Sequence, residues 1–187
     1  MQKHSDEQLM LAFSQSDSSP AFDELYARHK DAVYRYYLRN VSNEAISQEL
    51  FQDLWLKVIN NKQKYQVKAK FTTWLYTLAH HRLVDWYRRN NLEKKAFVDN
   101  LDETEAEDLG QIDWNPADEL QSKRLAKQLK QAITQLPADQ REVFILHQES
   151  ALTLPQIAEM LQTGLEKVKS RYRYSIKKLR NALEKGV

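Results

Sequence analysis

Apolar residues recur at helical spacing along the first part of the chain, and this spacing predicts two amphipathic helices. Ser5 can cap the first helix, and Ser19 with Pro20 opens the second, because the N–H that proline lacks has no partner in a first helical turn. The predicted inner faces carry Leu9, Met10, Phe13, Phe22, Leu25, Tyr26, His29, Val33 and Tyr36.

Two further helices are predicted between residues 43 and 89. One covers residues 43–59 and the other residues 71–89, and a polar, basic loop over residues 60–70 joins them. Their predicted inner positions are Ile46, Leu50, Leu54, Val58, Phe71, Leu75, Leu78, Ala79 and Trp86.

Apolar residues thin out between about residues 92 and 115, where acids accumulate without a stable period, so this stretch is expected to be a linker. Helical spacing resumes over residues 116–135, breaks at Pro137, and continues over residues 139–149. Val143, Phe144 and Leu146 are the expected buried face of this later helix. Few glycines or prolines and no period-two alternation favour an all-α fold with helical domains at 1–92 and 119–187, joined by an acidic linker at 93–118.

A helix-turn-helix pattern occupies residues 154–173. Ile157, Ala158 and Leu161 have the spacing of a core face, and Thr163 followed by Glu166 predicts a capping box that starts the next helix. That helix is strongly basic, with Lys167, Lys169, Arg171, Arg173, Lys177, Lys178, Arg180 and Lys185 against Glu166 and Glu184. A DNA-reading helix accounts for this charge; the alternative is an ordinary helix with a solvated cationic face.

Charge is segregated along the chain although the formal net charge is only +2. A second basic block covers residues 60–90, and the linker region between the two blocks is strongly acidic. The chain has no cysteine, no secretory signal and no apolar run long enough to span a membrane, so we expect a cytoplasmic protein without membrane insertion.

The basic block at residues 60–90 is interleaved with aromatic residues: Tyr65, Phe71, Trp74, Tyr76, Trp86 and Tyr87. Cations that follow phosphates, together with rings that stack on unpaired bases, are typical of proteins that grip single-stranded nucleic acid. Helical spacing favours core positions for Phe71 and Trp86, whereas Tyr65 and Trp74 are harder to explain by burial. The helix before this block also has large apolar residues on more than one side, which fits either a core helix or a partner surface.

Three segments resemble the bacterial extracytoplasmic-function sigma factors. Residues 49–58 are similar to the family's polymerase-binding helix, residues 71–89 to its promoter-melting helix, and residues 136–171 to its −35-reading domain. In such proteins the first domain binds core RNA polymerase and captures the unpaired −10 strand of promoter DNA, while the second reads the duplex −35 element. An anti-sigma factor is a further partner that the resemblance implies, and no cofactor, metal or enzymatic activity is expected.

The resemblance also implies site residues. Polymerase contacts are expected at Glu49, Gln52, Asp53 and Trp55. Contacts with the −10 strand are expected at Lys62, Lys64, Tyr65, Lys68, Lys70, Phe71 and Trp74. Contacts with the −35 duplex are expected at Lys167, Lys169, Ser170, Arg171 and Arg173.

Two other classes of function remain as alternatives. One is a helix-turn-helix regulator whose first domain senses a ligand or dimerises; such a protein would bind a symmetric operator without polymerase. The other is a helical enzyme built on His80, His81 and Asp85, or on His29 near Asp31. Adjacent histidines on a helix point about 100° apart and cannot share a metal ion, and no nucleotide-binding or zinc-protease motif occurs, so the enzyme is disfavoured.

Overall fold

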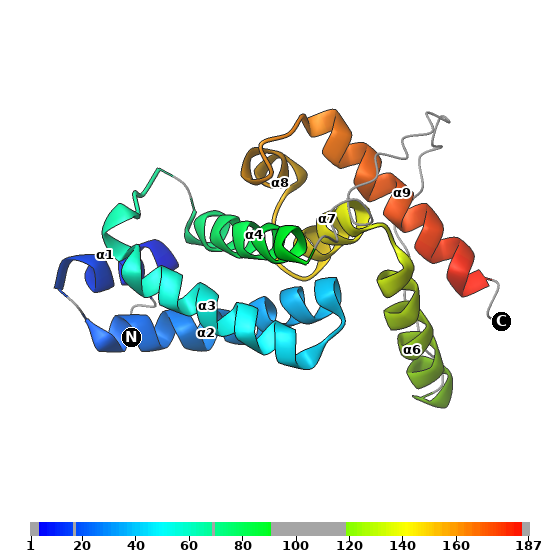
Figure 1. The fold of residues 1–187 in the computed structure, drawn as a ribbon, viewed down its shortest axis with the longest axis horizontal. Helices are drawn as coiled ribbons and strands as arrows, with labels where there is room; N and C mark the ends of the chain where they lie inside the picture. Colours follow the sequence, from blue (N-terminus) through cyan, green and yellow to red (C-terminus); the bar gives the residue numbers. More distant parts are fainter. Residues whose placement is uncertain (1–3, 17, 69, 91–118, 185–187) are drawn as a thin grey trace.

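The computed structural model describes residues 4–16, 18–68, 70–90 and 119–184, and within these ranges the chain forms helices and no strand (Figure 1). The predicted all-α class, with two helical units, is confirmed. The elements are α1 (Asp6–Ser16), α2 (Ser19–Val41), α3 (Glu44–Asn60), the 3-10 turn η1 (Lys62–Lys64), α4 (Phe71–Arg89), α6 (Glu119–Gln135), α7 (Ala138–Gln148), α8 (Leu154–Met160) and α9 (Leu165–Glu184). The predicted linker at 93–118 and the predicted helix start at Pro116 lie outside the described residues.

The first unit consists of α1 to α4, in which α2 packs against both α1 and α3, and α3 packs against α4. Its interior combines aliphatic and aromatic side chains. The most deeply buried of them are Met10, Leu25, Val33, Tyr36, Tyr37, Leu50, Leu54, Val58, Phe71, Leu75, Tyr76, Ala79 and Leu83. Burying each aliphatic side chain contributes about 1.5–3 kcal/mol, so this shared interior is what holds the four helices together.

The second unit consists of α6 to α9, and the long helix α9 contacts each of the other three (Figure 1). Its interior is mainly aliphatic, with Ile133, Leu136, Val143, Ile145, Leu146, Leu152, Ile157, Met160, Val168 and Leu179 buried. The predicted inner faces at Val143, Phe144 and Leu146 and at Ile157 and Ala158 are therefore correct. Because one side of α9 supplies part of this interior, its opposite side faces away from the unit.

Local capping explains why several helices begin where the sequence predicts. Ser5 Oγ accepts a hydrogen bond from the N–H of Gln8, and the Asn43 side chain accepts one from the N–H of Ile46. The structure has a capping box at Thr153 and Gln156, at the start of α8. The capping box predicted at Thr163 is wrong, because the first intrahelical bond of α9 runs from the Val168 N–H to the Gly164 carbonyl, which makes Gly164 the cap position.

Three turns contain a residue other than glycine with positive φ. Ser42 has a φ of 52° directly after α2, Ala151 a φ of 53° before α8, and Gln162 a φ of 50° between α8 and α9. The N–H of Ser42 bonds back to the Leu38 carbonyl, which satisfies one of the unpaired carbonyls at the end of α2. These left-handed residues let the chain reverse direction sharply at the helix ends.

The two units touch where α2 and α4 meet α7 and α8. The Glu142 carboxylate of α7 is almost fully buried there, and its Oε1 atom accepts a hydrogen bond from the Tyr36 hydroxyl at 2.5 Å. The same oxygen lies 2.7 Å from Nδ1 of His80 in α4. One carboxylate of the second unit thus contacts two helices of the first.

Other polar contacts also join the two units. Arg141 donates to the Asn40 carbonyl at 2.9 Å, and Arg39 pairs with Glu149 at 3.0 Å. A cavity of about 360 Å³ is lined by His80 and Arg88 of the first unit and by Glu142 and Arg171 of the second. The contact between the units therefore includes several polar groups.

Candidate nucleic-acid interface

One face of α9 presents polar and basic side chains away from the second unit. Glu166, Lys169, Ser170 and Arg173 share this face, because residues three and four apart lie on the same side of a helix. Lys169 Nζ lies 2.8 Å from the Glu166 carboxylate, and this contact lowers the pKa of Glu166. Arg173 donates to the Ser170 hydroxyl at 3.4 Å. The structure thus brings together three of the five residues predicted to contact duplex DNA.

Arg171 has a different environment from the one its sequence position implied. Its side chain is 14% exposed, and its Nε atom lies 3.0 Å from the Asp139 carboxylate of α7. Asp139 is itself buried, so the ion pair ties α9 to α7. Arg171 therefore lies apart from the exposed face of α9, while Lys167 is half-buried beside it.

The connection between α3 and α4 carries the other predicted DNA-binding residues. Lys64, Lys68 and Lys70 are exposed on it, and Val67 is 54% exposed among them. Lys62 is half-buried, with its ammonium 4.8 Å from the centre of the Phe13 ring. An exposed apolar residue between cations suits a strand whose phosphates and bases are both accessible.

The prediction that Tyr65 and Phe71 offer their rings to bases is not supported by their burial. Tyr65 is 5% exposed and Phe71 is fully buried, with 6.2 Å between the two ring centres. Trp74 is half-buried and packs 5.3 Å from the Tyr65 ring. Burial raises the pKa of the Tyr65 hydroxyl to about 12. These rings form the support on which the basic connection rests, because the loop folds back over the start of α4.

Glu49 and Gln52, two of the residues predicted to contact polymerase, are exposed on α3, and Asp53 is half-buried beside them. Asp53 forms an ion pair with Arg82 of α4, which fixes its carboxylate against the neighbouring helix. The sequence interpretation missed Leu56, which is 57% exposed one turn after Gln52. The sequence signal for it is a large apolar residue two positions after Leu54, which places Leu56 on the opposite side of the helix from the predicted inner positions.

Trp55, by contrast, does not lie on this surface. It is 5% exposed and packs 4.9 Å from the Tyr26 ring and 5.8 Å from the Phe22 ring. The predicted surface role of Trp55 is therefore corrected to a core role, because the aromatic residues of α2 and α3 cluster on the inner side.

The side chains considered for an enzyme have structural partners. His29 lies 2.7 Å from Asp6, and His80 contacts Glu142. Within the described parts of the chain, no group of three or more acidic or histidine side chains is placed to hold a metal ion. In the same parts, no helix has both the length and the hydropathy that a membrane span needs.

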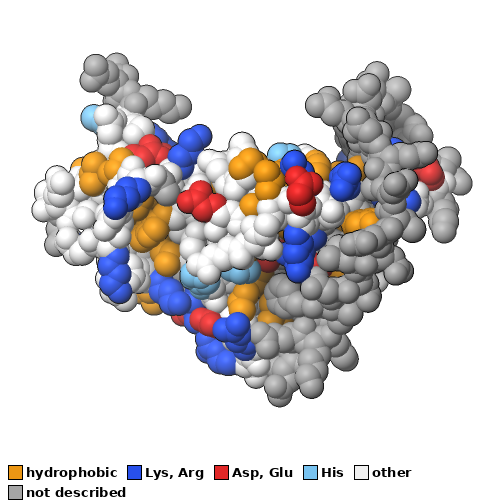
Figure 2. All heavy atoms as spheres, turned by 90° about the horizontal axis from the view of Figure 1, so that it is seen from above, with side chains coloured by type: hydrophobic (Ala, Val, Ile, Leu, Met, Phe, Trp, Pro, Cys, Tyr) orange, Lys and Arg blue, Asp and Glu red, His pale blue; other side chains and the backbone are white. Residues whose placement is uncertain are grey.

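On one face of the molecule, the described Lys and Arg side chains form separate groups (Figure 2). Figure 2 shows one face of the molecule, on which these groups are interrupted by hydrophobic and acidic side chains. The described cations therefore do not form one continuous strip on this face. Separate basic surfaces on α9 and on the α3–α4 connection fit two separate contacts with nucleic acid.

Two family models match the chain, one for each helical unit. The model described as sigma-70 region 2 matches residues 25–93, and the model described as sigma-70, region 4, matches residues 126–179. The first match contains α3, α4 and their connection, and the second contains the helix-turn-helix of α8 and α9. A regulator whose first unit senses a ligand is not favoured by this pair of matches.

Curated relatives and solved structures agree with these matches. RNA polymerase sigma factor YlaC of Bacillus subtilis is 28% identical over 162 residues, which cover 84% of this chain and 91% of YlaC. ECF RNA polymerase sigma factor SigE of Mycolicibacterium smegmatis is 29% identical over 167 residues, covering 89% of this chain and 63% of SigE. The structure of CnrH in complex with the cytosolic domain of CnrY has a TM-score of 0.67 at 20% identity and covers 97% of this chain and 99% of that one.

A second solved structure, the sigma factor RpoE in complex with the anti-sigma factor NepR from Bartonella quintana, has a TM-score of 0.65 at 20% identity. It covers 87% of this chain and 96% of that one, so its likeness extends over both helical units. Since both sigma-70 regions match in order and the relatives align along most of the chain, the protein belongs to the extracytoplasmic-function sigma factors, which direct RNA polymerase to promoters.

Proposed function

We propose that three surfaces of this sigma factor divide the work of promoter recognition. The exposed face of α3 binds core RNA polymerase, the α3–α4 connection captures the unpaired −10 strand, and the outward face of α9 binds the −35 duplex. The single observation that supports this division most strongly is that the exposed lysines of the connection and those of α9 lie on different helical units.

The polymerase surface is proposed to consist of Glu49, Gln52, Asp53 and Leu56. Leu56 would supply the apolar contact at its centre, and the acids around it would select a basic partner. The Asp53–Arg82 pair holds this surface against α4, so polymerase binding and strand capture involve neighbouring parts of one rigid unit.

Strand capture is proposed to rely on Lys64, Lys68 and Lys70 for phosphate contacts and on Val67 for apolar contact. Trp74 is half-buried and is proposed to add a stacking contact, and such contacts are worth about 1–3 kcal/mol per base. Tyr65 and Phe71 support the connection through the packing of their buried rings. Captured bases offset part of the energy of unpairing. The proposed capture includes no nucleotide hydrolysis.

Duplex binding is proposed to rely on Lys167, Lys169, Ser170 and Arg173, and Arg171 stays a predicted contact that would first have to leave Asp139.

We propose helical domains at 1–92 and 119–187 with an acidic linker at 93–118. Two weak DNA contacts on one tether strengthen each other, because the second forms at high effective concentration.

An anti-sigma factor is proposed as a regulatory partner. The solved structures with the same fold include RpoE bound to the anti-sigma factor NepR and CnrH bound to the cytosolic domain of CnrY. Their overall likeness to this chain covers both units, which supports a partner that binds the same architecture here.

Run-off transcription tests the proposal most directly. Purified protein and core RNA polymerase are offered a promoter library, and we expect transcripts that share one −35 and one −10 element. Lys169→Ala should weaken duplex binding across sequences and reduce the salt slope by about 1, whereas Lys127→Ala, an exposed lysine on α6, serves as the matched control. Failure to start transcription on any template would overturn the proposal.

A further inference from the structure

The α3–α4 connection is attached to α1 at its beginning. Gln63 of η1 donates a hydrogen bond from Nε2 to the Ser14 carbonyl at 2.7 Å. Lys62 lies over the ring of Phe13, also in α1. The start of the connection is therefore held against the carboxyl-terminal half of α1.

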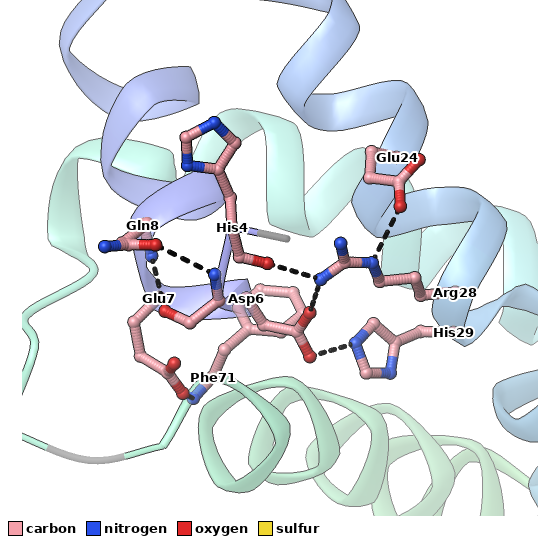
Figure 3. A network of polar contacts seen from close by, with 9 residues as sticks. His4, Asp6, Glu7, Gln8, Glu24, Arg28, His29 and Phe71 are labelled. Carbon is pink, nitrogen blue, oxygen red and sulfur yellow. Dashed lines mark hydrogen bonds and ion pairs between the residues drawn. The ribbon is translucent and has the colours of Figure 1, made fainter. Parts of the chain in front are cut away.

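The end of the connection is attached to the other end of α1. The Glu7 carboxylate accepts a hydrogen bond at 3.0 Å from the backbone N–H of Phe71, the first residue of α4 (Figure 3). The cap residue of α4 is Lys70, which makes no side-chain cap hydrogen bond. Glu7 thus supplies from another helix the acceptor and the negative charge that a helix start prefers. This contact is the main reason that the pKa of Glu7 is lowered.

The turn of α1 that carries Glu7 is held in place by contacts of the neighbouring residues. Asp6 accepts from Arg28 at 2.7 Å and lies 2.7 Å from Nε2 of His29, which fixes the start of α1 to α2. Ser5 and Gln8 cap the same turn (Figure 3). The His29 ring also packs 5.3 Å from the ring of Phe71. The first turn of α1 is therefore a fixed support for the first turn of α4.

Between these two attachments the connection exposes its lysines and Val67, while Tyr65 packs inward. A binding loop that is already ordered loses less conformational entropy when its ligand arrives, so it binds more tightly and selects more sharply. We propose that α1 fixes the shape of the strand-capturing connection and that Glu7 is a positioning residue for −10 recognition. This inference rests on the proposed role of the connection.

The test compares Glu7→Ala with Glu7→Gln in a polymerase holoenzyme assay. Promoter opening is followed with 2-aminopurine in the −10 strand of a promoter found by run-off transcription, and the −35 duplex is titrated separately. Loss of a helix cap leads us to expect about fivefold slower or less complete opening for Glu7→Ala. Glu7→Gln keeps an acceptor oxygen and should restore part of the loss. Gln15→Ala, which replaces an exposed residue of α1, should match the unchanged protein.

Preference among −10 bases is the readout that a merely structural role would not move. We expect Glu7→Ala to reduce the ratio of binding between matched and mismatched −10 single strands, with affinity for the −35 duplex unchanged. Gln63→Ala releases the other end of the connection and should reduce the same ratio.

The outcomes separate the inference from the proposed function. If the unchanged protein opens no promoter, the proposed function fails. If it opens promoters and both Glu7→Ala and Gln63→Ala retain full opening and base preference, the inference alone fails. A loss of −35 affinity equal to the loss of opening would also overturn it, because that result indicates general unfolding.

Discussion

The interiors of the two units and the contact between them are built from different kinds of side chain. Leu54 and Val143 are typical of the interiors, where apolar groups are completely buried. The contact between the units depends on Glu142, Tyr36 and His80, which are joined by hydrogen bonds. Apolar burial stabilises without regard to direction, whereas buried hydrogen bonds require a particular orientation. Burial therefore holds each unit together, and the hydrogen bonds of Glu142 add a directional contact between the units.

The largest effect is expected from a substitution that creates a cavity inside the first unit. Leu54→Ala removes a fully buried side chain and should lower the free energy of unfolding by about 2–5 kcal/mol. Urea unfolding followed by tryptophan fluorescence measures this change, because Trp55, Trp74 and Trp86 all lie in α3 and α4. Leu56→Ala is the control, since this leucine is 57% exposed and should change the free energy by less than about 0.5 kcal/mol. Equal effects of the two changes would contradict the assignment of the interior.

A smaller effect is expected from the buried carboxylate between the units. Glu142→Ala leaves the Tyr36 hydroxyl and His80 without their acceptor and should cost about 1–3 kcal/mol of unfolding free energy. A double-mutant cycle with Tyr36→Phe measures the coupling, which should reach about 0.5 kcal/mol or more for groups in direct contact. Strict additivity of the two changes would show that the hydrogen bond contributes nothing.

The contact between the units should also make stability depend on pH, through His80 and Glu142. Burial and the charge of Arg88 lower the pKa of His80. The charge and hydrogen bond of Glu142 raise this pKa by more, so the net shift is upward. A histidine with a raised pKa contributes its full stability below its unfolded pKa of about 6.5, and the contribution disappears as pH rises through the folded-state pKa. The stability difference between the unchanged protein and His80→Gln should therefore be larger in acid than at about pH 8.

Urea unfolding at a series of pH values measures this difference. His4→Gln is a suitable control, because His4 is exposed at the start of the chain. If the stability difference between the unchanged protein and His80→Gln grew with rising pH, it would contradict a stabilising contact between protonated His80 and Glu142.

The smallest effect is expected at the edge of the contact. Arg39 pairs with Glu149 while both side chains keep some exposure, at 27% and 19%. Arg39→Ala should cost about 0.2–1 kcal/mol, and the cost should shrink in high salt because exposed charges are screened. Lys30→Ala, at an exposed position on α2, provides the comparison for loss of a single cation. A cost that does not depend on salt would show that packing of the arginine stem dominates.

Much of the fold could be predicted because its signals are local. The helix predicted at residues 71–89 has the same bounds as α4, and Ser5 caps the start of α1 as predicted. Caps and apolar spacing depend on residues a few positions apart, so the sequence displays them directly.

The contacts that could not be predicted join residues far apart in the chain. Tyr36 and Glu142 are 106 positions apart, and nothing in either neighbourhood points to the other. The same holds for Glu7 and Phe71, which are 64 positions apart. The sequence predicts Tyr65 on the DNA-binding surface because a loop position gives no helical face, and only the packing of Tyr65 onto Trp74 reveals its burial.

The turns also have a consequence for the unfolded chain. Ala151 and Gln162 adopt left-handed φ angles that glycine would adopt without cost, and the whole sequence contains only three glycines. Each such residue raises the energy of the native backbone by about 1 kcal/mol, yet a side chain at that position restricts the denatured ensemble more than glycine would. Scarcity of glycine therefore moves part of the free-energy cost from chain entropy to local backbone strain.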